Sequence, residues 1–147
     1  MRTNTEKTLT SANSILQIRA KGFNDNWVKL EQYAADNAFD YGQGSIGETV
    51  IGVDGIQSGG FTPYEVDLNI QLQANSPSRS YFDKLINHIN NNQETVPVEF
   101  SCEIPSIKKR YNSSGFMVQI PGGTNARKLL EAATYTFRVV NNGAEDI

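Results

Sequence analysis

The sequence contains few side chains of the types that carry out nucleophilic or metal chemistry. Its one cysteine, Cys102, alternates with Phe100 and Ile104 in a strand-like pattern, which predicts a buried core thiol. Its one histidine, His88, lies off the apolar stripe of a predicted helix, where we expect a surface or interface position. A catalytic nucleophile needs an adjacent base, and a zinc site needs several Cys or His ligands. We therefore predict a protein that is not an enzyme and has no metal site and no cofactor.

Two short motifs have the outline of a ligand site. Residues 42–47, GQGSIG, match the G-x-G-x-x-G dinucleotide pattern, but no continuous buried strand pattern precedes them and no clear helix pattern follows. Residues 108–110, KKR, form a basic group. Three charges without a wider basic surface indicate a solvated loop or one side of an interface. Neither motif predicts a nucleotide or nucleic-acid site.

Composition narrows the class of protein further. The 147 residues, with a net charge of -3 and 38% hydrophobic residues, are those of one globular domain. A single cysteine allows no internal disulfide, and an acidic chain lacks the positive surface typical of nucleic-acid binding. The N-terminus is polar, and the apolar runs are far shorter than a membrane span. We expect a soluble protein with no membrane partner.

Alternation of apolar and polar residues predicts a mainly β fold. Residues 14–20 and 27–33 alternate and are separated by a turn, so we expect a hairpin. Residues 64–73 form the clearest strand, with one apolar and one polar face. Further expected elements are strands over 49–53, 96–104, 116–120 and 135–139, a turn over 112–115, and one or two helical turns over 126–133.

One segment has a helical pattern. Ser76 and Pro77 predict its start, an apolar stripe runs from Phe82 to Ile89, and the three asparagines of residues 90–92 are expected to end it. A lone helix must dock on the sheet. The fold class is therefore an antiparallel β-sandwich or barrel with one packed α-helix. The expected core residues are Val66, Leu68, Ile70, Leu72, Phe82, Leu85, Ile86, Val98, Phe100, Tyr135 and Phe137.

Three polar segments extend this single domain: an N-terminal arm (1–11), a glycine-rich loop (37–61) and a C-terminal tail (141–147). Asp54-Gly55 predicts a two-residue hairpin turn within the loop. A compact monomer does not need such extensions, whereas an assembly uses them to reach neighbouring subunits. The candidate inter-subunit residues are Asp40, Gly44, Glu48, Asp54, Gly55 and Gly59. The candidates for a lumen- or solvent-facing strand are Asp67, Asn69, Gln71 and Gln73.

The order of motifs over residues 49–89 resembles the tail tube proteins of contractile-tailed bacteriophages. Residues 52–55, GVDG, stand where that family has a Gly-Ala-Asp-Gly-like turn. A long alternating strand then leads to Asn75-Ser76-Pro77 and a helix, as in that family. The resemblance implies a structural virion protein that forms stacked, hexameric rings, each subunit adding strands to a β-barrel that lines the inner tube of the tail.

The resemblance also implies partners and a location. The expected partners are copies of the chain itself, the tail sheath, tape measure and baseplate proteins, and DNA that passes through the lumen without specific binding. The expected location is the tail of the virion, after assembly in the host cytoplasm. A polar, acidic wall suits such a conduit because it repels DNA phosphates.

Other interpretations remain open at this point. A type VI secretion tube protein and a tube-initiator or baseplate protein have the same general architecture. From a different class, a monomeric β-barrel module would bind carbohydrate or peptide in one aromatic-lined pocket. An enzyme is the third interpretation, and it would need acidic residues from distant strands to meet in a pocket. Rings or long polymers under electron microscopy would separate the first group from a monomeric module.

Overall fold

The computed structural model describes residues 1–10, 13–34 and 38–147, and its described part is mainly β with the helix α1. Seven strands form one antiparallel sheet in the order β2-β1-β7-β8-β9-β6-β3, and β4 and β5 pair only with each other. This confirms the predicted fold class. The elements are β1 (Ile15–Ala20), β2 (Asn24–Lys29), β3 (Phe39–Tyr41), β4 (Gly47–Ile51), β5 (Gln57–Phe61), β6 (Val66–Leu72), α1 (Ser78–Asn92), β7 (Val98–Ile104), β8 (Lys109–Gln119) and β9 (Ala133–Asp146).

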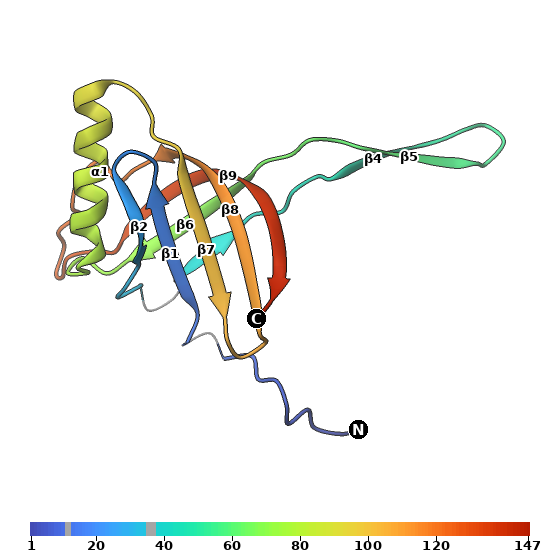
Figure 1. Cartoon of the computed structure of the whole chain (residues 1–147), viewed down its shortest axis with the longest axis horizontal. Coiled ribbons are helices and arrows are strands. Elements are labelled where there is room, and N and C mark those ends of the chain that lie inside the picture. The colour runs from blue at the N-terminus through green and yellow to red at the C-terminus, as the bar shows by residue number, and fades with distance from the viewer. Residues whose placement is uncertain (11–12, 35–37) are drawn as a thin grey trace.

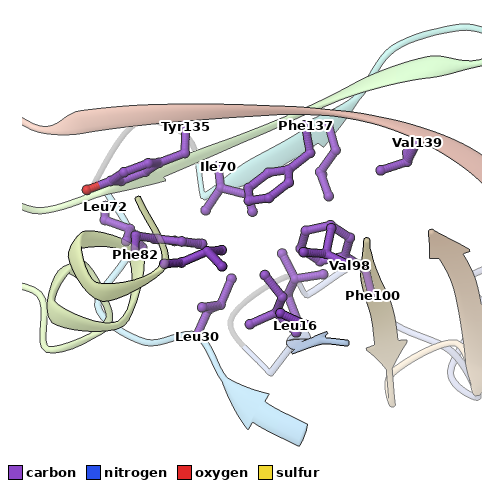
Figure 2. Close-up of a cluster of buried hydrophobic side chains, with 14 of the residues drawn as sticks. Leu16, Leu30, Ile70, Leu72, Phe82, Val98, Phe100, Tyr135, Phe137 and Val139 are labelled. Atoms are coloured by element: carbon purple, nitrogen blue, oxygen red, sulfur yellow. The ribbon is translucent and has the colours of Figure 1, made fainter. Parts of the chain in front are cut away.

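The seven-stranded sheet curls until its two halves face each other across the core. β6 and β9 lie on one side of the core and β1 and β7 on the other, while β8 connects the halves (Figures 1 and 2). Phe100 on β7 and Phe137 on β9 show the closure, because their ring centroids are 4.9 Å apart although β8 separates their strands. Register shifts in the β8–β9 pair, between Asn112 and Ser113 and between Met117 and Gln119, add bending.

Gly115 lies on β8, directly against the backbone of β9. A Cβ atom at this position would lie 2.7 Å from the Cα atom of Val139, and would be closer still to the carbonyl oxygen of Arg138. Real Cβ atoms do not approach backbone atoms so closely, so only glycine allows this contact.

The core fills the curl, and α1 covers one end of it. Phe82 on α1 stacks on Tyr135 with ring centroids 4.4 Å apart and also contacts Phe137, at 5.9 Å (Figure 2). All the predicted core residues are buried or pack against the core, with Val66 and Ile86 only partly buried. The largest fully buried side chains are Tyr135, Phe82, Phe100, Phe137, Leu16, Ile18, Leu30, Leu68, Ile70, Leu72, Leu85 and Val98.

The start of α1 is fastened to the chain that follows β2. The Ser76 hydroxyl accepts a hydrogen bond from the Ser78 N–H (3.3 Å) and donates one to the Glu31 carbonyl (2.6 Å). The Ser78 hydroxyl accepts one from the Glu31 N–H (2.8 Å). Ser76 was predicted as the cap and Pro77 as the first helical residue, but Pro77 occupies the cap position and the helix begins at Ser78. The other end also differs from the prediction. The helix continues through Asn92, and Gln93, not an asparagine, adopts the left-handed conformation with φ of 54°.

Two expected elements are wrong because long-range pairing overrides the local signal. Residues 112–115 form no turn, since they belong to β8, which pairs with β7 on one side and with β9 on the other. The reversal occurs earlier, at residues 105–108, where Lys108 has φ of 56°. Residues 126–133 form no helical turns: Ala126 makes an isolated bridge with Leu130, and Ala133 begins β9.

Other strands differ in length from the predictions. β6 is three residues shorter than expected, and β2 begins earlier and ends at Lys29. After β2 the chain crosses to the far edge of the sheet: the Leu30 N–H donates to the Leu16 carbonyl (2.9 Å), and Tyr33 bridges Leu72. This crossing helps to close the curl, because it joins the two edges of the sheet.

The three segments that were predicted to be polar extensions differ in structure. Residues 1–10 are exposed and extend away from the sheet (Figure 1), and residue 11 lies outside the described residues. Residue 37 also lies outside them, and residues 38–61 are not an irregular loop, since they contain β3 and the projecting β4–β5 hairpin. Residues 141–146 are the end of β9, paired with β8, so this segment is a strand rather than a tail.

Candidate assembly surface

The β4–β5 hairpin projects far from the body of the molecule (Figure 1). The Gly55 N–H donates to the Gly52 carbonyl (2.9 Å), and Gly55 has a φ of 84°, which favours glycine. The Asp54 side chain supports the turn by accepting a hydrogen bond from the Ile56 N–H (3.2 Å). The turn predicted at Asp54-Gly55 is therefore present, although the connection between the strands is longer than the two residues expected.

The hairpin carries apolar side chains that its own chain leaves in solvent. Every residue of β4 and β5 is exposed, and Val50, Ile51 and Ile56 are each between 65% and 72% exposed. Val53 at the turn and Phe61 at the base are also exposed. A two-stranded ribbon is marginally stable on its own, and exposed apolar patches mark interaction sites. The hairpin therefore has the character of a segment that binds another surface.

The end of the curled sheet that α1 leaves open contains an apolar pocket of about 510 Å³, which we name the mouth pocket. Aromatic rings from three separate segments, Tyr41, Tyr64 and Tyr111, contribute to its wall. The residues that line it are all uncharged: Phe39, Tyr41, Gly42, Gly44, Ile46, Tyr64, Val66, Cys102, Ile104, Tyr111, Asn112, Ser113, Val139 and Asn141.

Cys102 confirms the prediction of a buried thiol, since its side chain is buried where it lines the mouth pocket. Burial raises the pKa of this thiol to about 11, with a smaller contribution from the carboxylate of Glu103. The thiol is therefore protonated at neutral pH and a weak nucleophile.

Beside the mouth pocket, β9 has an edge without a strand partner in the described chain. β8 pairs with β9 as far as Asp146, whereas β6 pairs with it only over Ala133–Val139. Residues 140–146 are therefore paired on one side only in the part of the chain that the structure describes. Such an edge is a template for a further strand.

Ion pairs fasten the end of β9 to the start of β8. Lys109 pairs with Asp146, and Arg110 pairs with Glu103 (2.7 Å) and Glu145 (3.2 Å). The hydrogen bonds and charge of these cations lower the pKa of Glu145 and of Asp146. The basic group of residues 108–110 was expected in a solvated loop or at an interface. Lys109 and Arg110 lie in strand β8 rather than in a loop and are ion-paired within the chain, while the position at an interface stays a prediction.

The comparison with protein families decides what kind of protein this is. A family model described as tail fiber protein gp32 matches residues 7–142, which include the hairpin and all the residues that line the mouth pocket. The chain belongs to the gp32 family. It is thus a structural, virion-associated protein of the bacteriophage tail. No curated protein matches the chain. The helix of the described part of this gp32-family chain is too short and too polar to span a bilayer.

The candidate inter-subunit residues of the gp32-family chain gather at the hairpin. Glu48 and Gly59 lie on its strands and Asp54 and Gly55 in its turn, while Gly44 lies at its base and lines the mouth pocket. Asp40 does not belong to this group. It lies on the edge strand β3, where its carboxylate accepts a hydrogen bond from the Asn69 side chain (3.0 Å).

The polar face of β6 lies on the outside of the curl and is tied to its neighbours. Arg138 donates to Asp67 (3.1 Å), and the Thr136 hydroxyl donates to the Asn69 side chain (2.7 Å). Gln71 is on the same face, and Gln73, just beyond the strand, accepts a hydrogen bond from Gln32 (3.1 Å). The Asp67–Arg138 pair means that this face is mixed in charge rather than purely acidic.

The two remaining motifs, residues 42–47 and His88, do not form the sites that their residue types suggest, although Gly42, Gly44 and Ile46 line the mouth pocket. Residues 42–47 lead into strand β4 rather than into a helix, which is not the geometry of a dinucleotide site. His88 is on α1, beside the ring of Phe23 at 5.4 Å. Sequence reasoning missed the mouth pocket, because its tyrosines come from segments with no common spacing.

Proposed function

We propose that this tail protein is the repeating subunit of an inner tail tube, built from copies of the chain as stacked rings. The observation that carries the proposal is the β4–β5 hairpin, whose apolar side chains project into solvent. A monomer has no use for such a hairpin, whereas a polymer buries it between subunits. The resemblance over residues 49–89, which implies hexameric rings, covers this hairpin except for its first two residues.

Edge strands support closure into rings. β2 and β3 are the edges of the seven-stranded sheet, and residues 140–146 of β9 add a third open backbone edge. Contacts that join different edges of neighbouring copies generate rings or helical polymers, and closure removes exposed edges. In this arrangement the polar outer face of β6 faces either the lumen or bulk solvent, and its residues are Asp67, Asn69, Gln71 and Gln73. DNA passes through the lumen without specific binding.

Other tail proteins would contact the tube. Sheath protein surrounds it, tape measure protein occupies it during assembly, and baseplate protein starts it. The subunit needs no metal or cofactor and has no enzymatic role, since its work is mechanical. A tube-initiator or baseplate protein and a tube protein of type VI secretion are closely related alternatives with the same general architecture.

Two specific observations favour other functions. The description of the matching family names a tail fibre, so a fibre subunit is the second candidate. The aromatic-lined mouth pocket is the feature expected of a ligand-binding module. All three candidates differ in the particle that they form in solution.

Negative-stain electron microscopy of the purified chain tests the proposal. We expect rings, or tubes of constant width with a stained lumen. A fibre subunit would give thin rods without a lumen, and a binding module would give single small particles at high concentration. Either of these two results contradicts the tube.

A hairpin replacement makes the test specific. Because the Thr62 N–H donates to the Ile46 carbonyl (3.0 Å), residues 47–61 can be replaced by an Asn-Gly turn at that pair. The shortened chain should fold, since β4 and β5 pair only with each other, but should form no polymer. Gln57→Ala, a polar change in the same hairpin, is the control that should still polymerise. Polymers from the shortened chain would contradict the role given to the hairpin.

A further inference from the structure

The hairpin and the mouth pocket have matching chemistry. We propose that the hairpin tip, residues 50–56, docks in the mouth pocket of a second copy of this chain. The inference rests on the proposed self-assembly and deepens it, because it names the surface that receives the hairpin. It also assigns an occupant to the pocket, whose wall is aromatic and uncharged.

The tip has the side chains that such a pocket accepts. Ile51, Val53 and Ile56 are apolar and exposed, and they surround the turn at the far end of the hairpin. The acidic residue of the tip, Asp54, has its carboxylate turned to the backbone N–H of Ile56. Burial of apolar side chains against apolar walls is favourable for both surfaces.

The chain cannot bring its own tip to its own pocket. Gly44, Ile46 and Tyr64, at the base of the hairpin, line the pocket, and the hairpin leads away from this point (Figure 1). The base is fastened by hydrogen bonds of Thr62, from its N–H to the Ile46 carbonyl (3.0 Å) and from its hydroxyl to the Ser45 carbonyl (2.9 Å). Tip and pocket must therefore meet between copies.

Such a contact joins two different surfaces, so it repeats from copy to copy instead of stopping at a dimer. The open edge of β9 strengthens it. Asn141 belongs to this edge and also lines the pocket, so a docked hairpin finds free backbone groups beside the apolar wall.

The N-terminal arm is a less suitable occupant. It lies near the same end of the sheet, where the Ser106 hydroxyl donates to the Thr10 carbonyl (3.2 Å). Its side chains over residues 2–8 are polar or charged, and Leu9 is the large apolar residue next to them. The arm would leave most of the apolar wall uncovered, whereas the hairpin tip covers it.

Disulfide formation between two differently substituted chains tests the docking. In a Cys102→Ser background, Val53→Cys is placed on a chain with a larger tag, and Tyr111→Cys on an untagged chain. Val53 is fully exposed, and Tyr111 is 38% exposed in the wall of the mouth pocket, so neither substitution replaces a fully buried core side chain. Under mild oxidation we expect the mixed dimer to form at least about tenfold faster than in a control with Lys84→Cys on α1, because docked thiols reach effective concentrations on the order of millimolar.

A second cysteine position in the pocket keeps the test valid if the Tyr111→Cys variant does not fold. Asn141→Cys also lines the pocket and should link to Val53→Cys in the same way. No link from either pocket position above the Lys84→Cys level would overturn the docking. Linkage of Leu9→Cys instead of Val53→Cys would show that the arm occupies the pocket and would overturn it too.

Microscopy of the unsubstituted chain separates the two proposals. Rings or tubes without the Val53–Tyr111 or Val53–Asn141 link would refute the docking and leave the tube function standing. Single particles without any link would refute both. Tubes together with either link are the expected result.

Discussion

Gly115→Ala is the change with the most direct prediction, because it adds one methyl group where two strands nearly touch. The new Cβ would lie 2.7 Å from the Cα atom of Val139, and nearer to the carbonyl oxygen of Arg138. Both are backbone atoms of β9, so no side chain can turn aside. The alanine is accommodated only if β8 and β9 separate and the curl opens.

The loss in free energy of unfolding depends on which atoms must move to make room for the methyl group. Forcing one methyl group into a tightly packed site typically costs about 1–3 kcal/mol, and sometimes more. Since the obstruction is backbone and Val139 packs in the core, we expect the upper end, roughly 3 kcal/mol. This is a large part of the roughly 5–15 kcal/mol by which a domain is stable.

Urea unfolding followed by circular dichroism measures the effect as a lower midpoint with an unchanged slope. Gly60→Ala is the matched control, because this strand glycine has open space where the Cβ would be. It should be neutral or stabilising by up to about 1 kcal/mol, through the unfolded state. If Gly115→Ala unfolds within 0.5 kcal/mol of Gly60→Ala, roughly the scatter of surface substitutions, then β8 and β9 do not approach as described.

Two further predictions concern the core and the pH dependence of stability. Leu68→Ala removes a fully buried side chain from β6 and should cost about 2–5 kcal/mol in urea unfolding, and a cost below 1 kcal/mol, roughly that of a surface change, would contradict its burial. The pKa values of Glu145 and Asp146 are lowered from 4.5 and 3.8 by Arg110 and Lys109. Stability from these pairs is therefore complete above the ordinary values and is lost as the pH falls through the lower folded ones. The double variant Glu145→Gln, Asp146→Asn should flatten the loss of stability in acid, measured as the urea midpoint against pH, and an unchanged profile would refute the assignment.

The sequence predicted those features of the fold that depend on alternation or helical period. Leu68, Ile70 and Leu72 alternate with polar residues, and all three are fully buried. The stripe on α1 placed Phe82 and Leu85 in the core. These signals are reliable because each reports on which face of one element is dry.

The failures arose where distant pairing decided the structure. Residues 112–115, NSSG, have the composition of a turn, yet β7 and β9 hold them as the centre of a long strand. Gly115 is present for close approach of β9 rather than for reversal of the chain. Local composition cannot distinguish these two uses of glycine, since the partner strand is far away in the sequence.

The candidate assembly surface also has one part that local sequence predicts and one part that depends on distant pairing. The hairpin turn was predictable, since Asp54-Gly55 is a local signal. The mouth pocket was not, because Tyr41, Tyr64 and Tyr111 meet only after the sheet has curled. The ion pairs of Lys109 and Arg110 with the end of β9 were hidden for the same reason.

The hairpin starts at the open end of the sheet and projects away from it, so the hairpin tip and the mouth pocket are separate surfaces of one subunit. A polymer formed by the proposed docking has all its subunits oriented alike, so its two ends are chemically different. One end displays bare apolar hairpins, and the other displays vacant aromatic pockets. A protein that starts such a polymer must bind one of these two surfaces, and a protein that stops its growth must bind the other.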